Sequence, residues 1–251
     1  ISAFKKPNES NESRNAMKTV IPLWDAPTVP VDGTDARFPV RHIYCVGRNY
    51  AEHAAEMGGD ATKEPPFFFT KAADAILPVL PGQVGRMPYP LSTKSLHHEI
   101  EMVVAIGKGG ARITAEHALS HVFGYAVGLD MTRRDLQNTA KETRRPWDTA
   151  KSFANSAPIG AIHPVAHGAH RKRGAITLDV NGARRQTGDL HDMIWDVAHT
   201  LAFLSKLYEL MPVDLVYSGT PAGVGAVVAG DRLDAHVDGL SPLSIEIVAG
   251  A

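Results

Sequence analysis

The chain has 251 residues, of which 44% are hydrophobic and 21% charged, which is ordinary for a soluble protein of one large domain or two small ones. Its 26 basic and 27 acidic side chains leave a formal charge of −1, and no basic stripe or aromatic RNA-binding motif indicates nucleic acid. One cysteine excludes an internal disulfide framework and fits a cytoplasmic protein, and no apolar run approaches the roughly 20 residues of a membrane span.

The first 16 residues are polar and lack the apolar core of a secretory leader. We predict that residues 1–16 are a disordered extension or a cloning remnant, with Met17 as the natural start. A proline-punctuated, extended segment is expected over 17–37. No repeat or linker divides the rest, so residues 38–251 are predicted to form a single domain.

Apolar periodicity predicts the elements of this domain. The expected strands, in chain order, are 41–47, part of 64–78, 99–106, 122–130, 176–180 paired with 183–187 through an Asn-Gly turn, and late strands within 215–225 and 231–249. The expected helices are 49–57 with Asn49 as N-cap, 114–122 and 192–210. Strands do not alternate regularly with long helices, so the pattern disfavours a doubly wound sheet and indicates a β-rich α+β fold.

Two glutamates, Glu99 and Glu101, open the apolar strand of LHHEIEMVVAIG. Side chains alternate faces along a strand, so both carboxylates share one face and Ile100 points to the other. A solvent-facing edge with two scattered acids is one interpretation. Asp130 favours another, because it ends the apolar strand VFGYAVGLD, where a buried strand has little reason to deliver a charge. Three hard oxygen ligands suit a divalent cation such as Mg²⁺.

His97 shares the predicted face of the two glutamates. A nitrogen-containing site for Zn²⁺ or Mn²⁺ therefore stays open. The zinc signatures HExxH and CxxC are absent from the sequence. The spacing alone thus indicates a divalent cation without fixing which one.

His53 and Glu56 lie three residues apart in the expected helix 49–57 and are neighbours on one face. A carboxylate beside an imidazole fixes its tautomer and stabilises the imidazolium, as a general base requires. A solvated surface helix carries the same spacing without function, so that alternative remains. Cys45 lies inside an apolar strand pattern and is expected to be a buried structural thiol rather than a nucleophile.

Polar residues follow Asp130 in DMTRRDLQ, and Lys151 comes after RRPWDTA. Cations such as Arg133, Arg134 and Lys151 can neutralise substrate carboxylates, and Gln137 can donate to an oxyanion. Taken alone, they are ordinary surface residues. The turn SGTPAGVG (218–225) offers backbone amides to a carboxylate but lacks the Gly-Lys-Ser/Thr of a phosphate loop.

Taken together and in order, CVGRNYAEHAAEMG, PPFFFTKAADAILP, LHHEIEMVVAIG, GYAVGLDMTRRDLQ, AKSFANSAPIG and SGTPAGVG resemble the fumarylacetoacetate hydrolase family over about residues 38–249. The segments FPVRHIYCVGRNY, HHEIE, VAIGKGG and RRPWDTAKSF most resemble its bacterial branch that acts on fumarylpyruvate in aromatic compound breakdown. The resemblance implies a mixed β-roll with short helices around it, a catalytic domain over 38–251, a homodimer, and Mg²⁺ (or Mn²⁺) at the active site.

The resemblance also carries roles to individual positions. Glu99, Glu101 and Asp130 match the metal ligands, and His53 and Glu56 match a water-activating dyad on a helix that behaves as a lid in relatives. Lys151 matches the lysine beside the metal, and the positions that match substrate contacts are Arg48, Arg134, Gln137 and Thr220. The family usually has no histidine ligand, so His97 is expected beside the ligands. Residues 1–16 and the loop 163–174 are unmatched.

The implied reaction is hydrolysis of a carbon–carbon bond in an acylpyruvate, a small 2-oxo dicarboxylate, with fumarylpyruvate giving fumarate and pyruvate. His53, oriented by Glu56, is expected to take a proton from the water that attacks the distal carbonyl. Gln137 and Lys151 are expected to stabilise the oxyanion, and the metal to favour the enolate leaving group.

Three alternatives stay open. Relatives with the same dyad and metal decarboxylate oxaloacetate, and others isomerise or decarboxylate hydroxylated dienedioates, often without a competent dyad. A non-catalytic binding protein on the same scaffold is the alternative of another class. The intact ligands, dyad and lysine favour hydrolysis.

Overall fold

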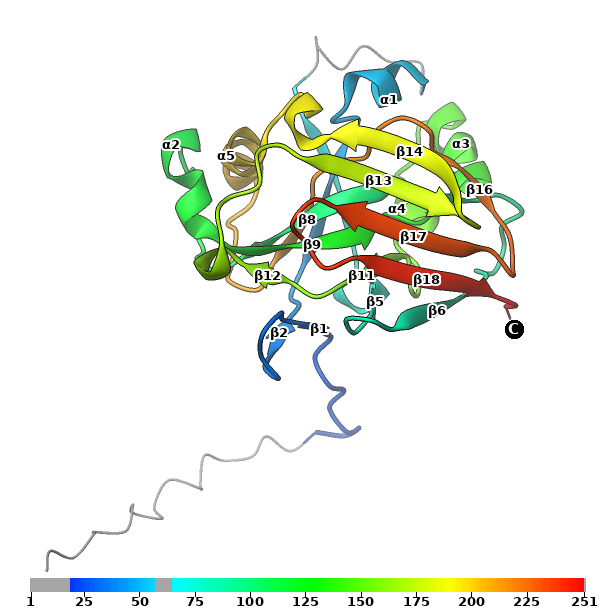
Figure 1. The fold of residues 1–251 in the computed structure, drawn as a ribbon, viewed down its shortest axis with the longest axis horizontal. Coiled ribbons are helices and arrows are strands. Elements are labelled where there is room, and N and C mark those ends of the chain that lie inside the picture. The colour runs from blue at the N-terminus through cyan, green and yellow to red at the C-terminus, as the bar shows by residue number, and fades with distance from the viewer. Residues whose placement is uncertain (1–18, 57–64, 251) are drawn as a thin grey trace, which may run out of the picture.

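The structure is a computed structural model that describes residues 19–56 and 65–250 (Figure 1). The predicted extension 1–16 lies outside these ranges. Two large sheets and two small ones make up most of it. The eight-stranded sheet has, in spatial order, β4 (Phe67–Lys71), β3 (Ile43–Gly47), β15 (Leu215–Tyr217), β8 (Ile100–Ile106), β9 (Val122–Leu129), β11 (Ala157–Ile159) and β5 (Ile76–Pro78), and β12 (His163–Pro164) also pairs with β9. The five-stranded sheet has β14 (Ala183–Asp189), β13 (Ala175–Val180), β17 (Arg232–Val237), β18 (Leu243–Val248) and β6 (Val84–Pro88). The three-stranded sheet has β10 (Thr132–Arg133), β7 (Leu96–His98) and β16 (Gly225–Val227), and the two-stranded sheet has β1 (Thr28–Pro30) and β2 (Arg37–Pro39).

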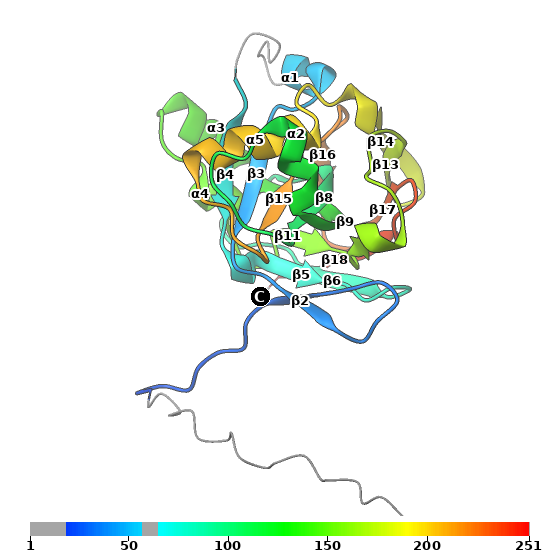
Figure 2. The ribbon, with the colours of Figure 1, turned by 90° about the vertical axis from the view of Figure 1, so that its left-hand side faces the viewer.

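Within the described residues, five α-helices surround the sheets: α1 (Ala51–Glu56), α2 (Ala115–Ala118), α3 (Arg134–Glu142), α4 (Asp148–Lys151) and α5 (Val197–Leu207). Figures 1 and 2 show α2 and α5 on one side of the molecule, α3 and α4 on the other, and α1 above the curled sheet. No helix within the described ranges is long and apolar enough to cross a bilayer. The β-rich α+β prediction, with a mixed β-roll and short helices around it, is confirmed.

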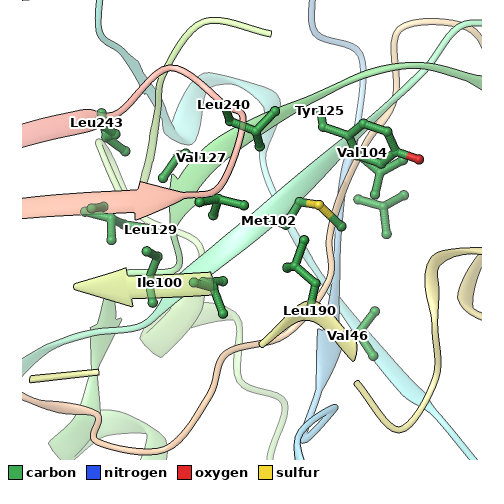
Figure 3. Close-up of a cluster of buried hydrophobic side chains, with 14 of the residues drawn as sticks. Val46, Ile100, Met102, Val104, Tyr125, Val127, Leu129, Leu190, Leu240 and Leu243 are labelled. Atoms are coloured by element: carbon green, nitrogen blue, oxygen red, sulfur yellow. The ribbon is translucent and has the colours of Figure 1, made fainter. Parts of the chain in front are cut away.

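The main core lies between the eight-stranded and the five-stranded sheets. Alternation along β8 sends Ile100, Met102 and Val104 to this core, where they meet β9 and the β17–β18 corner (Figure 3). Val103 and Ala105 point to a second core on the opposite face. All seven residues of β8 are buried, so this central strand is covered on both sides, and its near-continuous apolar sequence follows from that.

Most strand predictions are confirmed, including the hairpin of β13 and β14. The helices differ more. The predicted helix 192–210 is shorter, because the Asp196 side chain accepts a hydrogen bond from the His199 amide at 2.9 Å and caps α5 there. The predicted helix 49–57 is α1, which begins at Ala51; the Asn49 carboxamide instead holds the backbone of Trp195 and Ser218, at 2.8 Å each.

Candidate active site

Two of the predicted metal ligands lie where the chain passes from the large sheet to the small three-stranded one. Glu99 sits between β7 and β8, and Asp130 sits between β9 and β10. The Asp130 amide donates a hydrogen bond to the Glu99 carbonyl at 2.8 Å. The β7–β8 junction and the β9–β10 junction therefore lie side by side. The expectation of one continuous strand through Glu99 and Glu101 is wrong, since β8 begins at Ile100. The convergence of their carboxylates is nevertheless observed.

One carboxylate oxygen from each of Glu99, Glu101 and Asp130 lies within 4.8 Å of the other two, and all three side chains are buried. Glu101 is held by the turn that follows β15, because the Gly219 amide donates to Glu101 Oε2 at 2.7 Å. The sequence predicted that this turn meets a carboxylate, and the carboxylate that it meets is the protein's own. Gly219 has φ +96°, a conformation that favours glycine, and a side chain there would strike Asn49.

Two buried lysines face the carboxylates. Lys151 Nζ lies 2.8 Å from Glu99 Oε2, 2.6 Å from Asp130 Oδ2 and 2.6 Å from Thr132 Oγ1, so protein oxygens accept all three of its N–H bonds. Lys71 Nζ lies 2.8 Å from Asp130 Oδ1. These ion pairs are almost completely withdrawn from solvent, and breaking one leaves an uncompensated buried charge.

The three carboxylates do not share these cations equally. Burial alone would raise the pKa of Glu99, but Lys151 and Arg134, whose guanidinium contacts its Oε1, hold that pKa well below the ordinary range. Burial, reinforced by repulsion from Asp130 and Glu99, raises the pKa of Glu101 well above it. Among the residues that the structure describes, Glu101 thus has no cation of its own within ion-pair distance.

The cluster fits a divalent cation. Its ligand atoms are hard oxygens, which Mg²⁺ and Mn²⁺ prefer, and they lie close enough together to share one ion. Asp130 Oδ1 is buried and accepts no hydrogen bond from the residues that the structure describes, although Lys71 is near. A cation would complete the coordination of this atom and relieve the repulsion on Glu101.

The carboxylates open into one narrow pocket with a free volume of about 30 Å³, room for one or two water molecules. It brings together eight of the ten residues predicted for the site. The lining residues among them are His53, Glu99, Glu101 and Lys151, with Arg48, Arg134, Gln137 and Thr220 from the predicted substrate contacts. Asp130 lies behind them with no exposed surface.

α1 places His53 at this pocket, where the imidazole is 6% exposed. Glu56 is the last residue of the same helix, and its side chain lies outside the part of the chain that the structure describes. The dyad therefore stays a prediction. Cys45 is completely buried, and burial raises the pKa of its thiol well above the ordinary range, as expected for a structural cysteine.

Three of the predicted substrate contacts, Arg134, Gln137 and Thr220, make hydrogen bonds within the protein. Arg134 Nη1 donates to Gln137 Oε1 at 2.5 Å, one helical turn apart on α3, which orients the Gln137 amide group. Thr220 Oγ1 accepts a hydrogen bond from Gln186 Nε2 at 2.8 Å. His97 lies outside the carboxylate cluster, with Nε2 3.1 Å from Ser95 Oγ, and burial lowers its pKa to about 4.

Three residues that the sequence did not single out belong to this site. Lys71 ends the apolar strand β4, the same signal that pointed to Asp130 at the end of β9. Gln186 is completely buried and satisfies four partners: it accepts from the His98 ring and the Ile100 amide, and it donates to Thr220 and the Pro221 carbonyl. Lys141 lines the pocket from α3. No local pattern marks Gln186 or Lys141.

Comparison with known proteins gives consistent matches. Residues 42–248 match the family described as Fumarylacetoacetate (FAA) hydrolase C-terminal. The chain is 42% identical to a fumarylpyruvate hydrolase of Ralstonia sp. over 188 residues, covering 75% of the chain and 95% of the relative. It is 39% identical to an oxaloacetate tautomerase of Escherichia coli over 207 residues, covering 81% and 91%.

Among solved structures, a fumarylpyruvate hydrolase from Pseudomonas aeruginosa in complex with Mn²⁺ and pyruvate has a TM-score of 0.91 and 50% sequence identity, covering 92% of this chain and all of that one. The fold agrees with these matches. The chain belongs to the fumarylacetoacetate hydrolase family.

Proposed function

We propose that this protein hydrolyses the carbon–carbon bond of an acylpyruvate, with fumarylpyruvate as its substrate and fumarate and pyruvate as products. The observation that carries the proposal is the joining, in one pocket, of a buried carboxylate cluster that fits a divalent cation, a histidine and an excess of cationic side chains. The relatives named fumarylpyruvate hydrolase, at 42% and 50% identity, support the substrate.

Glu99, Glu101 and Asp130 are the residues that would hold the cation, which we propose to be Mg²⁺, with Mn²⁺ as a substitute. When bound, such an ion polarises the 2-oxo acid and acts as a Lewis acid for the leaving group. Lys151 and Lys71 fix the orientation of the ligand oxygens from behind. Because all three N–H bonds of Lys151 are taken by protein oxygens, we assign oxyanion stabilisation first to Gln137.

His53 is the proposed general base. It takes a proton from water as the water oxygen bonds to the carbonyl carbon next to the acyl chain, C4 of the acylpyruvate. The tetrahedral carbon then expels C3, and the electron pair of the C3–C4 bond passes into the pyruvate enolate. The imidazolium of His53 can return the proton to C3, which gives pyruvate and the free acid. We propose that Glu56 orients His53 from the same helix.

A second candidate is a reaction of oxaloacetate at the same site. It is favoured by the 39% identity to a relative named oxaloacetate tautomerase, and decarboxylation of oxaloacetate likewise produces a pyruvate enolate. Both substrates are 2-oxo acids that present the same chelating end. They differ at the far end, where an acylpyruvate places a carbonyl and an acyl chain.

We further propose that the protein is a cytoplasmic homodimer whose catalytic domain spans 38–251. The single, buried cysteine is in keeping with a reducing compartment. Sedimentation velocity tests the dimer directly, and a monomer across the working concentrations would contradict it.

The experiment that tests the function follows the enol absorbance of fumarylpyruvate, maleylpyruvate and acetylpyruvate, with oxaloacetate in parallel. Each is measured with Mg²⁺ and again after chelation. Fast cleavage of fumarylpyruvate that is lost on chelation and restored by added Mg²⁺ is the expected result. Turnover of oxaloacetate alone would favour the second candidate, and no turnover of any of the four would overturn the assignment of an enzyme.

A further inference from the structure

One face of α3 leads away from the carboxylate cluster along the pocket. Arg134, Gln137 and Lys141 are spaced i, i+3 and i+7, so they lie in one row on the helix. All three line the pocket. Arg134 at the start of the row contacts Glu99, whereas Lys141 lies about 10 Å further along the helix axis. The row therefore has an inner end at the proposed cation and an outer end at Lys141.

Lys141 is in an environment that disfavours its charge. Burial, together with repulsion from Arg134 and Arg48, lowers the pKa of its ammonium to about 8. Among the described residues, no carboxylate lies within ion-pair distance of Lys141, and its nearest recorded partner is the Trp147 ring, with 5.4 Å between Nζ and the ring centroid. A half-buried ammonium that is repelled by two guanidinium groups is poised for an anion from outside the protein.

Aromatic and cationic side chains line the pocket together with Lys141. Phe67 and Trp147 meet edge to face at 5.4 Å, and the Arg48 guanidinium lies 5.9 Å from the Phe67 ring centroid. Arg48 has φ +56°, so its backbone is held in a conformation that few residues other than glycine adopt. Phe67, Trp147, Arg48 and Lys141 all line the same pocket, so an acyl chain in it would meet apolar rings beside two cations.

We propose that Lys141, together with Arg48, binds the distal carboxylate of a dicarboxylic acylpyruvate, and that Lys141 thereby sets the preference for a four-carbon unsaturated diacid chain over a short neutral acyl group. This inference rests on the proposed acylpyruvate hydrolysis. The seven-carbon chain of fumarylpyruvate would extend from the carboxylate cluster along α3 to Lys141, and its binding would require the narrow pocket to widen beyond its free volume of about 30 Å³. Acetylpyruvate carries no second carboxylate and would leave Lys141 without a ligand.

The test compares Lys141→Met and Lys141→Arg with the control Lys206→Met. Lys206 is also a lysine over an aromatic ring, 4.7 Å from the Phe203 centroid, but it lies on α5, outside the pocket. We expect Lys141→Met to lower the ratio of kcat/KM for fumarylpyruvate to that for acetylpyruvate by about 10- to 100-fold, the range of a charge-assisted hydrogen bond. Lys141→Arg retains most of the ratio, and Lys206→Met leaves it unchanged.

A binding measurement on chelated protein tests the same residue without turnover. Fumarate is titrated calorimetrically into the wild type and each variant, with acetate as the monoanion control. We expect fumarate to bind the wild type more tightly than acetate and Lys141→Met to lose that difference. An unchanged selectivity ratio in Lys141→Met, or equal binding of both anions to the wild type, would overturn the inference.

Failure of the proposed function gives a different pattern. If the wild type cleaves no acylpyruvate, the proposed function is wrong. Loss of the preference for fumarate over acetate in Lys141→Met would still show that Lys141 binds a carboxylate. If the wild type cleaves fumarylpyruvate and Lys141→Met slows both substrates in the same proportion, the function stands and the inference about Lys141 is wrong.

Discussion

The Lys71 ammonium lies 2.8 Å from Asp130 Oδ1, and neither side chain has more than 1% of its surface exposed. This pair joins the end of β4 to the end of β9 beneath the proposed cation site. Burying both charges is costly, and each stabilises the structure only while its partner is present. Because Asp130 would also contact a bound cation, the contribution of Lys71 to stability should depend on the occupancy of the site.

Lys71→Met is expected to destabilise the chelated protein by about 3–5 kcal/mol, the usual cost of removing one partner of a buried ion pair, although Lys151 still contacts Asp130 Oδ2. The loss should be smaller with Mg²⁺, because the ion supplies positive charge at Asp130. Arg184→Met is the control: it removes the exposed pair with Asp179 and should cost about 0–1 kcal/mol. Urea unfolding with and without Mg²⁺ measures the free energy of unfolding of both variants. Equal losses of stability in Lys71→Met and Arg184→Met would contradict a special role for the buried pair.

Glu101 and Glu99 are expected to respond to neutralisation with opposite sign. Because the folded protein raises the pKa of Glu101, ionisation of this carboxyl opposes folding of the chelated protein as the pH rises above the ordinary value of 4.5. Glu101→Gln should therefore raise the chelated Tm, with a gain that grows with pH, while it weakens divalent cation binding. The Gly219 hydrogen bond survives, since a carboxamide oxygen can accept it.

Glu99→Gln is the matched variant in the same cluster. The pKa of Glu99 is lowered, so its ionised form stabilises the fold above 4.5, and that stability is lost as the pH falls through the lowered pKa. Neutralising Glu99 should lower the chelated Tm at neutral pH, because Lys151 and Arg134 lose their partner. A parallel rise or fall of Tm in both glutamine variants would refute the unequal sharing of cations.

His53→Gln is expected to lower kcat for fumarylpyruvate by about 100- to 10,000-fold, the range for loss of a general base. Divalent cation affinity, measured calorimetrically, should remain near the wild-type value, because His53 is outside the ligand cluster. His199→Gln is the control, since His199 also lies beside a carboxylate, 2.8 Å from Asp196, but on the exposed start of α5. Near-normal turnover in His53→Gln would remove the proposed base.

The preference for fumarylpyruvate over acetylpyruvate should depend on pH through Lys141. Its pKa in the free enzyme is lowered to about 8, so the ammonium is present below that value and is lost above it. The ratio of kcat/KM values for the two substrates should be constant at acidic and neutral pH and fall at alkaline pH. Groups that serve both substrates cancel in the ratio. Lys141→Arg should keep the ratio constant, and a decline of the same size in that variant would exclude Lys141 as the cause.

Much of the fold could be predicted because the information is local. Short, nearly continuous apolar runs predict β3, β8 and β9, and the Asn-Gly turn predicts the β13–β14 hairpin. The apolar pattern does not predict α3, because its sequence RDLQNTAKE has only Leu136 and Ala140 as apolar residues, too few to form the apolar face of an amphipathic helix. Its inner face is polar because it lines a pocket.

The site was predictable where a charge interrupts an apolar pattern, as at Glu101 and Asp130. It was not predictable where the partner is distant in the chain. Gln186 meets His98 across 88 residues, and nothing in the strand β14 distinguishes it from its polar neighbours. The Gln186 carboxamide reaches Thr220 only because β14 pairs with β13 and lies beside the start of β8.

The most direct test of the proposed reaction is cleavage of fumarylpyruvate in water enriched in ¹⁸O, with mass analysis of the fumarate. Hydrolysis at C4 requires the attacking water to leave one oxygen in the new carboxylate, so we predict fumarate with one ¹⁸O atom, formed in step with pyruvate and only in the presence of a divalent cation. Release of carbon dioxide, or equilibration of enol and keto forms without fumarate, would contradict carbon–carbon hydrolysis.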